Sequence, residues 1–355
     1  MAVKIQRVNP LERREALVDY FLRLQAWPYA TRAEYLRYWD WRYTSISESD
    51  STAWIALDGD RIIGHIACNF RTLRCDGRRV RAAVPGNYLV DDAYHNTMVG
   101  VQLANSLMRL AKRDEIDLLL GFGNRAAHAL FVGLGCVEIG AMLPHVEVLQ
   151  WGPILARRLP VASVLAPAVN AASAAWRQFR RGRRARASVR VRDLTAEDLL
   201  ALDRSHWLEP AGLAWDGSLG YIARRFLTCP VRSYRVIGIT EGETGRLEGL
   251  VVVEGSARLN VVQCLVNEAT LTDVSAVELA VDASPAAEVA LVPLLPGSAL
   301  AGQFAAAGFV RRSRANADPV LQNTTWSAYW RPDHPLAARF ADTRCWKLWY
   351  GWSHH

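Results

Sequence analysis

The sequence predicts an α/β protein of two tandem domains of one fold, each with a mixed, mostly antiparallel sheet flanked by helices. Three observations lead to this prediction. The chain has 355 residues, and about 150 residues is usual for one domain. Strand-like and helix-like patterns alternate along it. The second half also repeats landmarks of the first half in the same order.

The first half begins with helical patterns and then changes to strands. Leu17 and Phe21 recur at helical spacing, and a second helical stretch covers residues 33–43. Asp-Gly pairs within residues 58–60 and 75–79 separate apolar runs, which is typical of hairpins. These patterns predict two helices followed by antiparallel strands.

A strand–loop–helix unit follows Asp92. The apolar period becomes about 3.6 residues over residues 103–110, which predicts an amphipathic helix. The apolar run at residues 116–122 has the length and composition of a buried strand. A further helix is expected at residues 125–134, and residues 145–151 are expected to close this half as a strand.

An internal duplication is predicted because four segments have counterparts in the same order. Gly64 in the first half corresponds to Gly249 in the second. The matched segments are residues 35–43 with 221–226, 51–68 with 232–254, 87–94 with 262–270, and 130–140 with 304–313.

The expected domain boundaries are residues 1–150, a linker of residues 151–187 and a second domain of residues 188–355. The linker is rich in Ala, Pro and Arg. Its apolar part, residues 161–176, is shorter than the ~20 residues that span a bilayer and contains Pro167. Two interpretations stay open: a solvated helix packed between the domains, or a basic amphipathic helix lying on an anionic membrane.

Composition and charge predict a cytoplasmic protein. The six cysteines are scattered singly without metal-ligand spacing, so reduced buried thiols and no metal site are expected. The N-terminus lacks the apolar core of a signal peptide or anchor, and no transmembrane segment is expected. The net charge is +7, but ten arginines lie between Arg157 and Arg192 and the rest of the chain is close to neutral. No oligomeric state is predicted.

Residues 54–145 carry a series of motifs in a recognisable order. They are a strand with I-x-G-H, a strand ending in VDDAY, a loop and helix, the motif L-x-G-F-x-N, and a helix closing in LGCVEIG. This stretch resembles a GCN5-related N-acetyltransferase (GNAT) domain. The W-x-W-R-Y segment is similar to that of tandem GNAT proteins from surface-polysaccharide and natural-product pathways. The resemblance implies a GNAT-like acyl-CoA-binding first domain and a degenerate second copy.

The loop before the predicted long helix matches the family only in part. GNAT enzymes have approximately Y-R-G-x-G-x-G there, and its backbone N–H groups with the helix N-terminus hold the pyrophosphate of coenzyme A. In this sequence Tyr94 and Gly100 match, while Met98 places a Cβ where a phosphate approaches closely. The alternative is an ordinary helix N-cap by Asn96 or Thr97.

The resemblance implies acetyl-CoA or another acyl-CoA as co-substrate. Asn124 corresponds to a residue that helps to hold the pantetheine arm, and Phe131 stands where the family has a tyrosine general acid. The expected contacts with the co-substrate are Val90, His95, Asn96, Thr97, Val99, Gly100, Asn124 and Phe131.

An amine acceptor arrives protonated and needs a base. The candidates at predicted strand ends are Asp91, Asp92, His95, His145 and Glu147. Asp91 and His145 are favoured as catalytic residues, and only one of Asp91 and Asp92 can face the cleft because neighbouring strand residues point to opposite faces. His65 is interpreted as a packed core residue and His128 as a surface residue.

The predicted function is acyl-CoA-dependent N- or O-acyl transfer, directly onto a small amine or amino sugar. One alternative is an aminoacyl-tRNA-dependent transferase, in which the arginines of residues 177–192 contact phosphates; tRNA is the one nucleic acid considered as a partner. Another alternative is a catalytically silent acyl-CoA-binding protein, suggested by His95, Met98 and Phe131 at family site positions.

Overall fold

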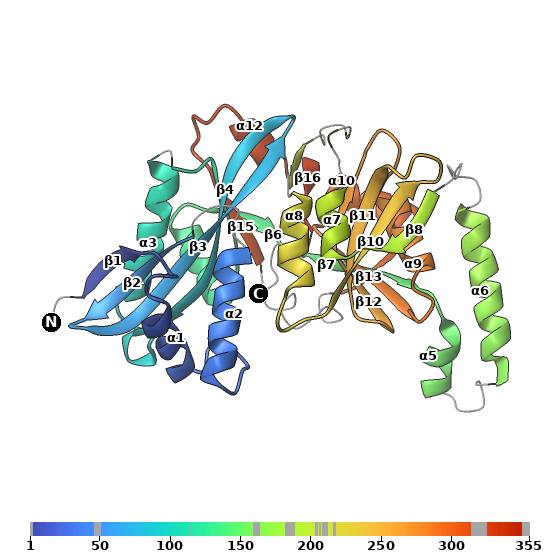
Figure 1. Ribbon diagram of the computed structural model, residues 1–355. Helices are drawn as coiled ribbons and strands as arrows, with labels where there is room; N and C mark the ends of the chain where they lie inside the picture. The colour runs from blue at the N-terminus through green and yellow to red at the C-terminus, as the bar shows by residue number, and fades with distance from the viewer. Residues whose placement is uncertain are drawn as a thin grey trace.

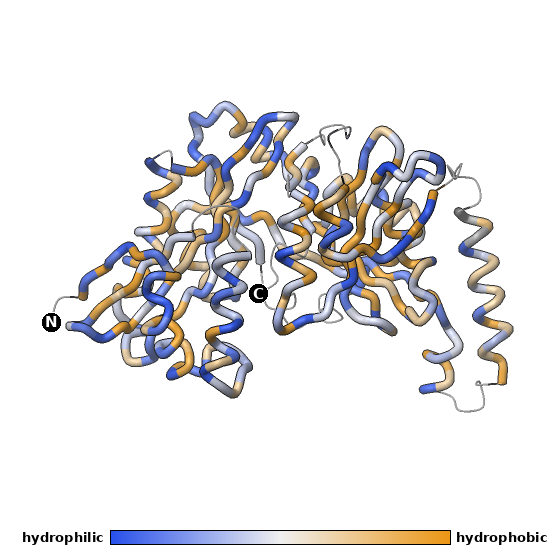
Figure 2. Tube along the Cα trace, viewed as in Figure 1, coloured by the Kyte–Doolittle hydropathy of each residue, from blue (hydrophilic) through white to orange (hydrophobic). Residues whose placement is uncertain are grey.

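The computed structural model describes residues 3–45, 51–113, 115–158, 164–181, 189–202, 205, 207, 212–215, 218–313 and 325–349. These residues form two mixed sheets that lie side by side, with helices against them (Figure 1). The strand β11 in the middle of the second sheet is hydrophobic and buried along nearly all of its length (Figure 2). No helix among the described residues is long and apolar enough to cross a membrane.

The first half has the predicted alternation of strands and helices. Its elements are β1 (Lys4–Val8), α1 (Arg14–Arg23), α2 (Arg32–Ser45), β2 (Thr52–Asp58), β3 (Arg61–Cys75), β4 (Arg78–Val90), η1 (Asp92–Tyr94), α3 (Val99–Lys112), β5 (Leu118–Gly123), α4 (Arg125–Gly133), β6 (Val137–Gly140) and β7 (Leu143–Val148). The expected Asp-Gly turns join β2 to β3 and β3 to β4, where Gly59 and Gly77 adopt φ of 58° and 78°.

The second half begins with two helices and then repeats the order of the first. Its elements are α5 (Trp151–Arg158), α6 (Ala166–Arg181), β8 (Val189–Asp193), α7 (Ala196–Ala201), β9 (Leu213–Trp215), α8 (Leu219–Ile222), η3 (Ala223–Leu227), β10 (Tyr234–Glu241), β11 (Leu247–Glu254), β12 (Arg258–Val266), α9 (Asp273–Asp282), β13 (Val289–Leu294), α10 (Ala299–Ala306), β14 (Val310–Arg311), β15 (Thr325–Tyr329), α12 (Ala337–Ala341), η5 (Thr343–Cys345) and β16 (Trp346–Lys347).

The matched glycines of the two halves have the same structural role. A Cβ on Gly64 of β3 would lie 2.8 Å from Leu103 of α3, and a Cβ on Gly249 of β11 would lie 2.7 Å from Leu271, just before α9. In both halves the strand therefore needs glycine because the segment that follows the next strand packs directly on it. The shared element order and this shared packing agree with the predicted duplication.

Both sheets are antiparallel apart from a few parallel pairs, as the sequence predicted. The first follows the order β1-β2-β3-β4-β5-β15-β6, and β9 and β16 add to it beside β3. The second follows the order β14-β7-β13-β12-β11-β10-β8. The pairs β4–β5, β12–β13 and β9–β16 are parallel.

Strands from each half join the sheet of the other half, which the expected boundary after residue 150 does not account for. Besides the two strands described next, β9 and β16 of the second half join the first sheet beside β3. β7 leaves the first half and pairs with β13 and β14 of the second sheet. β15 returns from the second half and pairs with β5 and β6 of the first sheet. The apolar pattern of residues 145–151 correctly predicts a strand, but a local pattern does not specify which strand it pairs with. Neither sheet is therefore complete within one contiguous half.

The expected linker of residues 151–187 contains the helices α5 and α6, which pack against each other at the far end of the second sheet (Figure 1). The backbone N–H of Gly152 donates to Asn170 Oδ1 at 2.8 Å, and Arg177 donates to the carbonyl of Leu149 at 2.7 Å. The segment is thus a helical pair at the end of the second sheet that faces away from the first sheet, and it does not lie between the two sheets (Figure 1). Residues 159–163 and 182–188 of the expected linker lie outside the described part of the chain.

Candidate active site

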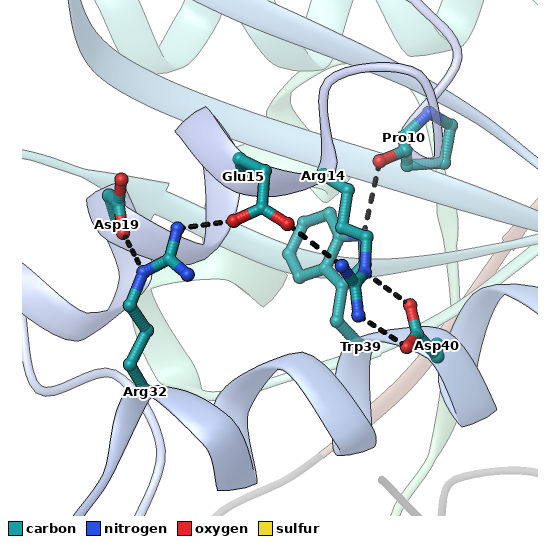
Figure 3. A network of polar contacts seen from close by, with 7 residues as sticks. All are labelled: Pro10, Arg14, Glu15, Asp19, Arg32, Trp39 and Asp40. Carbon is teal, nitrogen blue, oxygen red and sulfur yellow. Dashed lines mark hydrogen bonds and ion pairs between the residues drawn. The ribbon is translucent and has the colours of Figure 1, made fainter.

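Ion pairs fix α1 against α2 and so hold one wall of the site (Figure 3). Arg14 donates to both carboxylate oxygens of Asp40, at 2.5 and 2.6 Å. Arg32 donates to Asp19 at 2.7 Å and also to Glu15. Bidentate arginine–carboxylate contacts fix orientation as well as distance. The two helices that flank the connection of residues 24–31 are therefore held in a fixed orientation.

That connection brings Ala26 and Trp27 to the edge of a cavity. Tyr35 of α2 holds the backbone of Trp27, since its hydroxyl donates to the Trp27 carbonyl at 2.7 Å and accepts from the Trp27 N–H at 3.1 Å. The Trp27 ring packs on Phe21 of α1, with ring centroids 4.8 Å apart.

The cavity forms where β4 and β5 diverge. Their pairing ends with Ala83 opposite Leu119. Beyond that point β4 contains Pro85, which has no N–H to donate, and Asn87, whose φ is +54°. His65 of β3 donates from Nδ1 to the Asn87 carbonyl at 2.7 Å. Burial lowers the pKa of His65 to about 4, so this histidine is neutral and holds the bend in β4.

The cavity has a volume of about 830 Å³ and is lined by residues of α1, β4, α3, β5 and α4. Its size lies within the range usual for small-molecule and cofactor sites. Several residues expected to contact the co-substrate line it, namely Val90, His95, Thr97, Gly100, Asn124 and Phe131.

The N-terminus of α3 opens into this cavity without a side-chain cap. Met98 is the N-cap residue and forms no capping hydrogen bond, and the first turn has no acidic residue. The first helical bond is donated by Gln102 to the Met98 carbonyl at 2.9 Å. The N–H groups of Gly100 and Val101, both in the cavity wall, therefore lack acceptors within the helix. Thr97 Oγ1 accepts only from Val99, at 3.3 Å, so it is not the N3-bonding cap that was considered.

Two of the expected co-substrate contacts lie elsewhere. Val99 is only 3% exposed and packs into the core beneath α3, so its side chain does not reach the cavity. Asn96 is exposed and is not among the residues that line the cavity. Asn124 lines the cavity, but its Oδ1 also accepts from the Ala127 N–H at 3.0 Å and so caps α4.

Asp91 and His145, the favoured catalytic residues, do not line the cavity. Asp91 is buried and accepts hydrogen bonds from Arg61 at 2.9 Å and Arg23 at 3.2 Å, which ties β4 to β3 and α1. His145 lies in β7 of the second sheet, opposite Val292 of β13. Burial lowers the pKa of His145. Both placements correct the expectation, because the bend at Asn87 and the strand exchange redirect these segments.

The other base candidates also lie away from the diverging strands, except for one. Asp92 is almost fully exposed, and Glu147 is buried in β7 of the second sheet. His95 lines the cavity, but its Nε2 donates to the Val90 carbonyl at 2.8 Å.

Tyr88 is a cavity residue that the sequence did not single out. A Cβ on Gly100 would lie 2.5 Å from the hydroxyl oxygen of Tyr88, so the Tyr88 side chain extends from β4 to the first turn of α3. Its ring centroid lies 6.4 Å from that of Phe131. Burial raises the pKa of Tyr88 to about 12, so the phenol carries its proton at neutral pH. Gly100 is thus small partly to accommodate Tyr88, a reason that the motif alone does not reveal.

His128 also lines the cavity and is not the surface residue that was expected. Its Nε2 donates to Glu138 of β6 at 2.9 Å, which places the lone pair of a neutral imidazole on Nδ1. Nδ1 is buried and forms no hydrogen bond with any described residue. His128 lies one helical turn before Phe131, and this spacing is the sequence feature that could have identified it.

Comparisons with known proteins point to one family. Residues 14–135 match the model of the acetyltransferase (GNAT) family, a range that contains the entire cavity wall apart from Ser327. For residues 14–135 the match confirms the predicted GNAT family and, with it, the predicted enzyme class of acetyltransferase. Comparison with curated proteins gives no match.

Solved structures share the fold across nearly the whole chain. A conserved protein of unknown function from Enterococcus faecalis V583 has a TM-score of 0.61 at 9% identity, over 93% of this chain and 73% of its own. A GCN5-related N-acetyltransferase from Kribbella flavida has a TM-score of 0.53 at 14% identity, over 95% and 72%. Saccharomyces cerevisiae N-myristoyltransferase with bound myristoyl-CoA has a TM-score of 0.52 at 11% identity, over 93% and 84%. These likenesses confirm the predicted fold class.

Proposed function

We propose, from the premise that residues 14–135 form a domain of the acetyltransferase (GNAT) family, that this domain binds an acyl-CoA between β4 and β5 and transfers its acyl group directly to an acceptor. The proposal depends on one arrangement: the two strands diverge beside a helix N-terminus that has no side-chain cap and no acidic residue. Such an end favours phosphate through its free N–H groups and the helix dipole.

In this proposal the N–H groups of Gly100 and Val101 donate to the pyrophosphate of the acyl-CoA. Asn124 and Phe131 line the part of the cavity that the pantetheine arm would follow. The yeast N-myristoyltransferase of the same fold holds myristoyl-CoA, which supports an acyl-CoA as the co-substrate here. We propose acetyl-CoA first, because the family is named for acetyl transfer.

The acceptor we propose is a small amine or an amino sugar that enters beside Ala26 and Trp27. Trp27 lines this part of the cavity, and an aromatic side chain can pack against a sugar ring. The tRNA-dependent alternative is not proposed, because the arginine-rich helix α6 lies beyond the second sheet while the cavity lies in the first (Figure 1).

One residue is placed for a proton transfer. The acceptor nitrogen attacks the thioester carbonyl, and the bond between carbonyl carbon and sulfur breaks. We assign the proton lost by the nitrogen to Nδ1 of His128, which Glu138 orients, and the sulfur leaves as a thiolate, which is a tolerable leaving group because the reference pKa of a thiol is about 8.5. The hydroxyl of Tyr88 lies beside Gly100, at the end of the cavity that we assign to the pyrophosphate, and so is too far from the sulfur to take the role that Phe131 cannot fill.

A pair of matched variants tests where the acyl-CoA binds. Val101 and Ser275 occupy the third position of α3 and α9, respectively. An aspartate at this position suits a helix dipole, so both V101D and S275D should fold. V101D places a carboxylate beside the phosphates and should weaken acetyl-CoA binding by about 100-fold or more, whereas S275D should change it less than about 2-fold. Calorimetry on the full chain measures both.

An unchanged affinity in V101D, or an equal loss in S275D, would contradict the proposed site. Absence of acetyl-CoA binding by the unmodified chain would instead favour the catalytically silent alternative.

A further inference from the structure

The inner face of α6 is polar or small, which is unusual for a helix packed on a neighbour. Asn170 and Arg177 form the hydrogen bonds to the α5 region described above, and Ser173 accepts from Arg177 at 3.0 Å. A Cβ on Gly152 would lie 2.6 Å from the Cβ of Ala166. The residues that face α5 therefore recur at positions 166, 170, 173 and 177, one helical face.

The opposite face of α6 and the residue before it carry the large apolar side chains. Leu165, Trp176 and Phe179 are 62%, 60% and 68% exposed, and Ala168 and Ala172 are exposed between them. These positions follow helical spacing, so they form a continuous outward stripe about 21 Å long. The rings of Trp176 and Phe179 stack, with centroids 5.9 Å apart. We call this surface the α6 stripe.

No described residue covers the α6 stripe. None of the described side chains of α6 is buried, and none belongs to a hydrophobic core cluster. A water-soluble helix normally turns its large apolar residues inward, and contiguous exposed apolar surface marks an interaction site. In Figure 2 apolar and hydrophilic residues alternate along α6, which is the outermost element at this end of the molecule.

The segment that carries the stripe has charge of one sign only. Residues 151–192 contain ten arginines and no aspartate, glutamate or lysine. Three of the arginines, at positions 177, 180 and 181, belong to the last two turns of α6. Arg157 and Arg192 pair with Glu288 and Asp198, but the segment has no acidic residue of its own, so a partner that is anionic as well as apolar suits this surface.

We propose that the α6 stripe docks the protein on an anionic lipid bilayer, with α6 lying in the interface and its aromatic residues among the headgroups and upper acyl chains. A helix with an apolar stripe and an arginine-rich remainder is suited to this position, and aromatic residues favour it. The elements β4 and α3, which contribute to the cavity wall, lie at the other end of the molecule from α6 (Figure 1).

Other binding partners would match either the apolar side chains or the positive charge of the α6 stripe, but not both. A second copy of the chain would cover the stripe but bring two arginine-rich segments together without acidic partners. A nucleic acid would neutralise the arginines, but Leu165, Ala168 and Ala172 offer it no hydrogen bonds. A bilayer accounts for both the charge and the aliphatic positions.

Co-sedimentation of the full chain with vesicles tests the proposal. The protein should bind vesicles of phosphatidylcholine and phosphatidylglycerol in equal parts at least about 10-fold more tightly than vesicles of phosphatidylcholine alone, and salt should weaken binding. Replacing both aromatics (W176S with F179S) should weaken binding to the anionic vesicles by about 10-fold or more. The matched control L200S with V310S removes two other exposed apolar side chains and should bind as the unmodified chain does.

Equal binding to both kinds of vesicle, no binding to either, or full binding by W176S with F179S would overturn the proposal. Salt-sensitive binding of polyuridylate without vesicle binding would assign the surface to nucleic acid. A dimer in analytical ultracentrifugation that W176S with F179S disrupts, again without vesicle binding, would assign it to a second copy. Both of these outcomes also overturn it, and none of these measurements depends on acyl transfer.

Discussion

The two domains share a fold, but the N-termini of their corresponding helices differ. In the first domain α3 begins at Met98 with no capping side chain and no acidic residue in its first turn. In the second domain Thr272 caps α9 by accepting from the Ser275 N–H, and Asp273 begins the helix. The first arrangement attracts an anion, while the second satisfies its own donors and adds a negative charge.

The loop before α9 is also closed by its own side chains. Glu248 of β11 accepts from Asn267 Nδ2 at 2.8 Å and from Thr270 Oγ1 at 2.5 Å. Lys347 donates to the buried Asp273 at 3.1 Å. In the first domain the corresponding loop borders the cavity through His95 and Thr97. A duplicated fold can thus keep its sheet while one copy replaces ligand contacts by internal hydrogen bonds.

Of the changes we consider, removal of the exchanged strand β15 should have the largest effect on stability. A fragment of residues 1–150 should not fold, because β5 and β6 lose β15 and the buried Trp326 that packs on Phe122 at 5.3 Å. Loss of a buried tryptophan alone costs about 3–5 kcal/mol. Thermal unfolding followed by circular dichroism should show no cooperative transition.

The matched control restores the missing strand. β15 runs antiparallel to β6, with Gly140 opposite Trp326. A short flexible loop that joins Gly140 to residues 325–331 should therefore recover cooperative unfolding. A folded fragment 1–150, or no recovery in the joined form, would show that β15 does not complete the first domain.

Removal of the proposed base should lower turnover without changing co-substrate affinity. H128Q should reduce kcat by about 10²-fold, while acetyl-CoA affinity changes less than about 3-fold. The measurement is release of free coenzyme A with an amine acceptor. Unchanged kcat in H128Q would remove His128 from the mechanism.

The bend in β4 should make stability depend on pH through His65. Its pKa is lowered from 6.5 to about 4 in the folded state, so the unfolded chain binds more protons below pH 6.5. The contribution of neutral His65 to the free energy of unfolding is present above pH 6.5 and is lost as the pH falls toward 4. The expected loss is about 2 kcal/mol between pH 7 and pH 5.

Chemical denaturation at the two pH values measures this loss. H65Q should show a smaller difference between them, and H95Q, which changes an exposed histidine, should behave as the unmodified chain does. The same pH difference in H65Q and in the unmodified chain would contradict the role assigned to His65.

Local sequence patterns predicted the elements well because periodicity and turn residues act over short distances. The hairpins at Gly59 and Gly77 and the helices α3 and α4 follow this rule. The partners of β7 and β15 could not be predicted, because strand pairing across many residues leaves no local pattern. For the same reason, the expected boundary after residue 150 does not account for the pairing of these two strands.

The sequence predicted which segments contribute to the site, but not which side chains from different segments meet there. Val90, Gly100 and Phe131 line the cavity, as the motif order implied. Asp91 and His145 do not line the cavity, because orientation depends on the positive φ of Asn87 and on which side chains meet in space. Tyr88 and His128 were missed for the same reason, since no spacing rule brings β4, α3 and α4 together.

Calorimetric titration of the full chain with acetyl-CoA tests the central difference between the domains most directly. We predict one binding site per chain, lost in V101D and kept in S275D. Two sites per chain, or a single site that survives V101D and is lost in S275D, would contradict it.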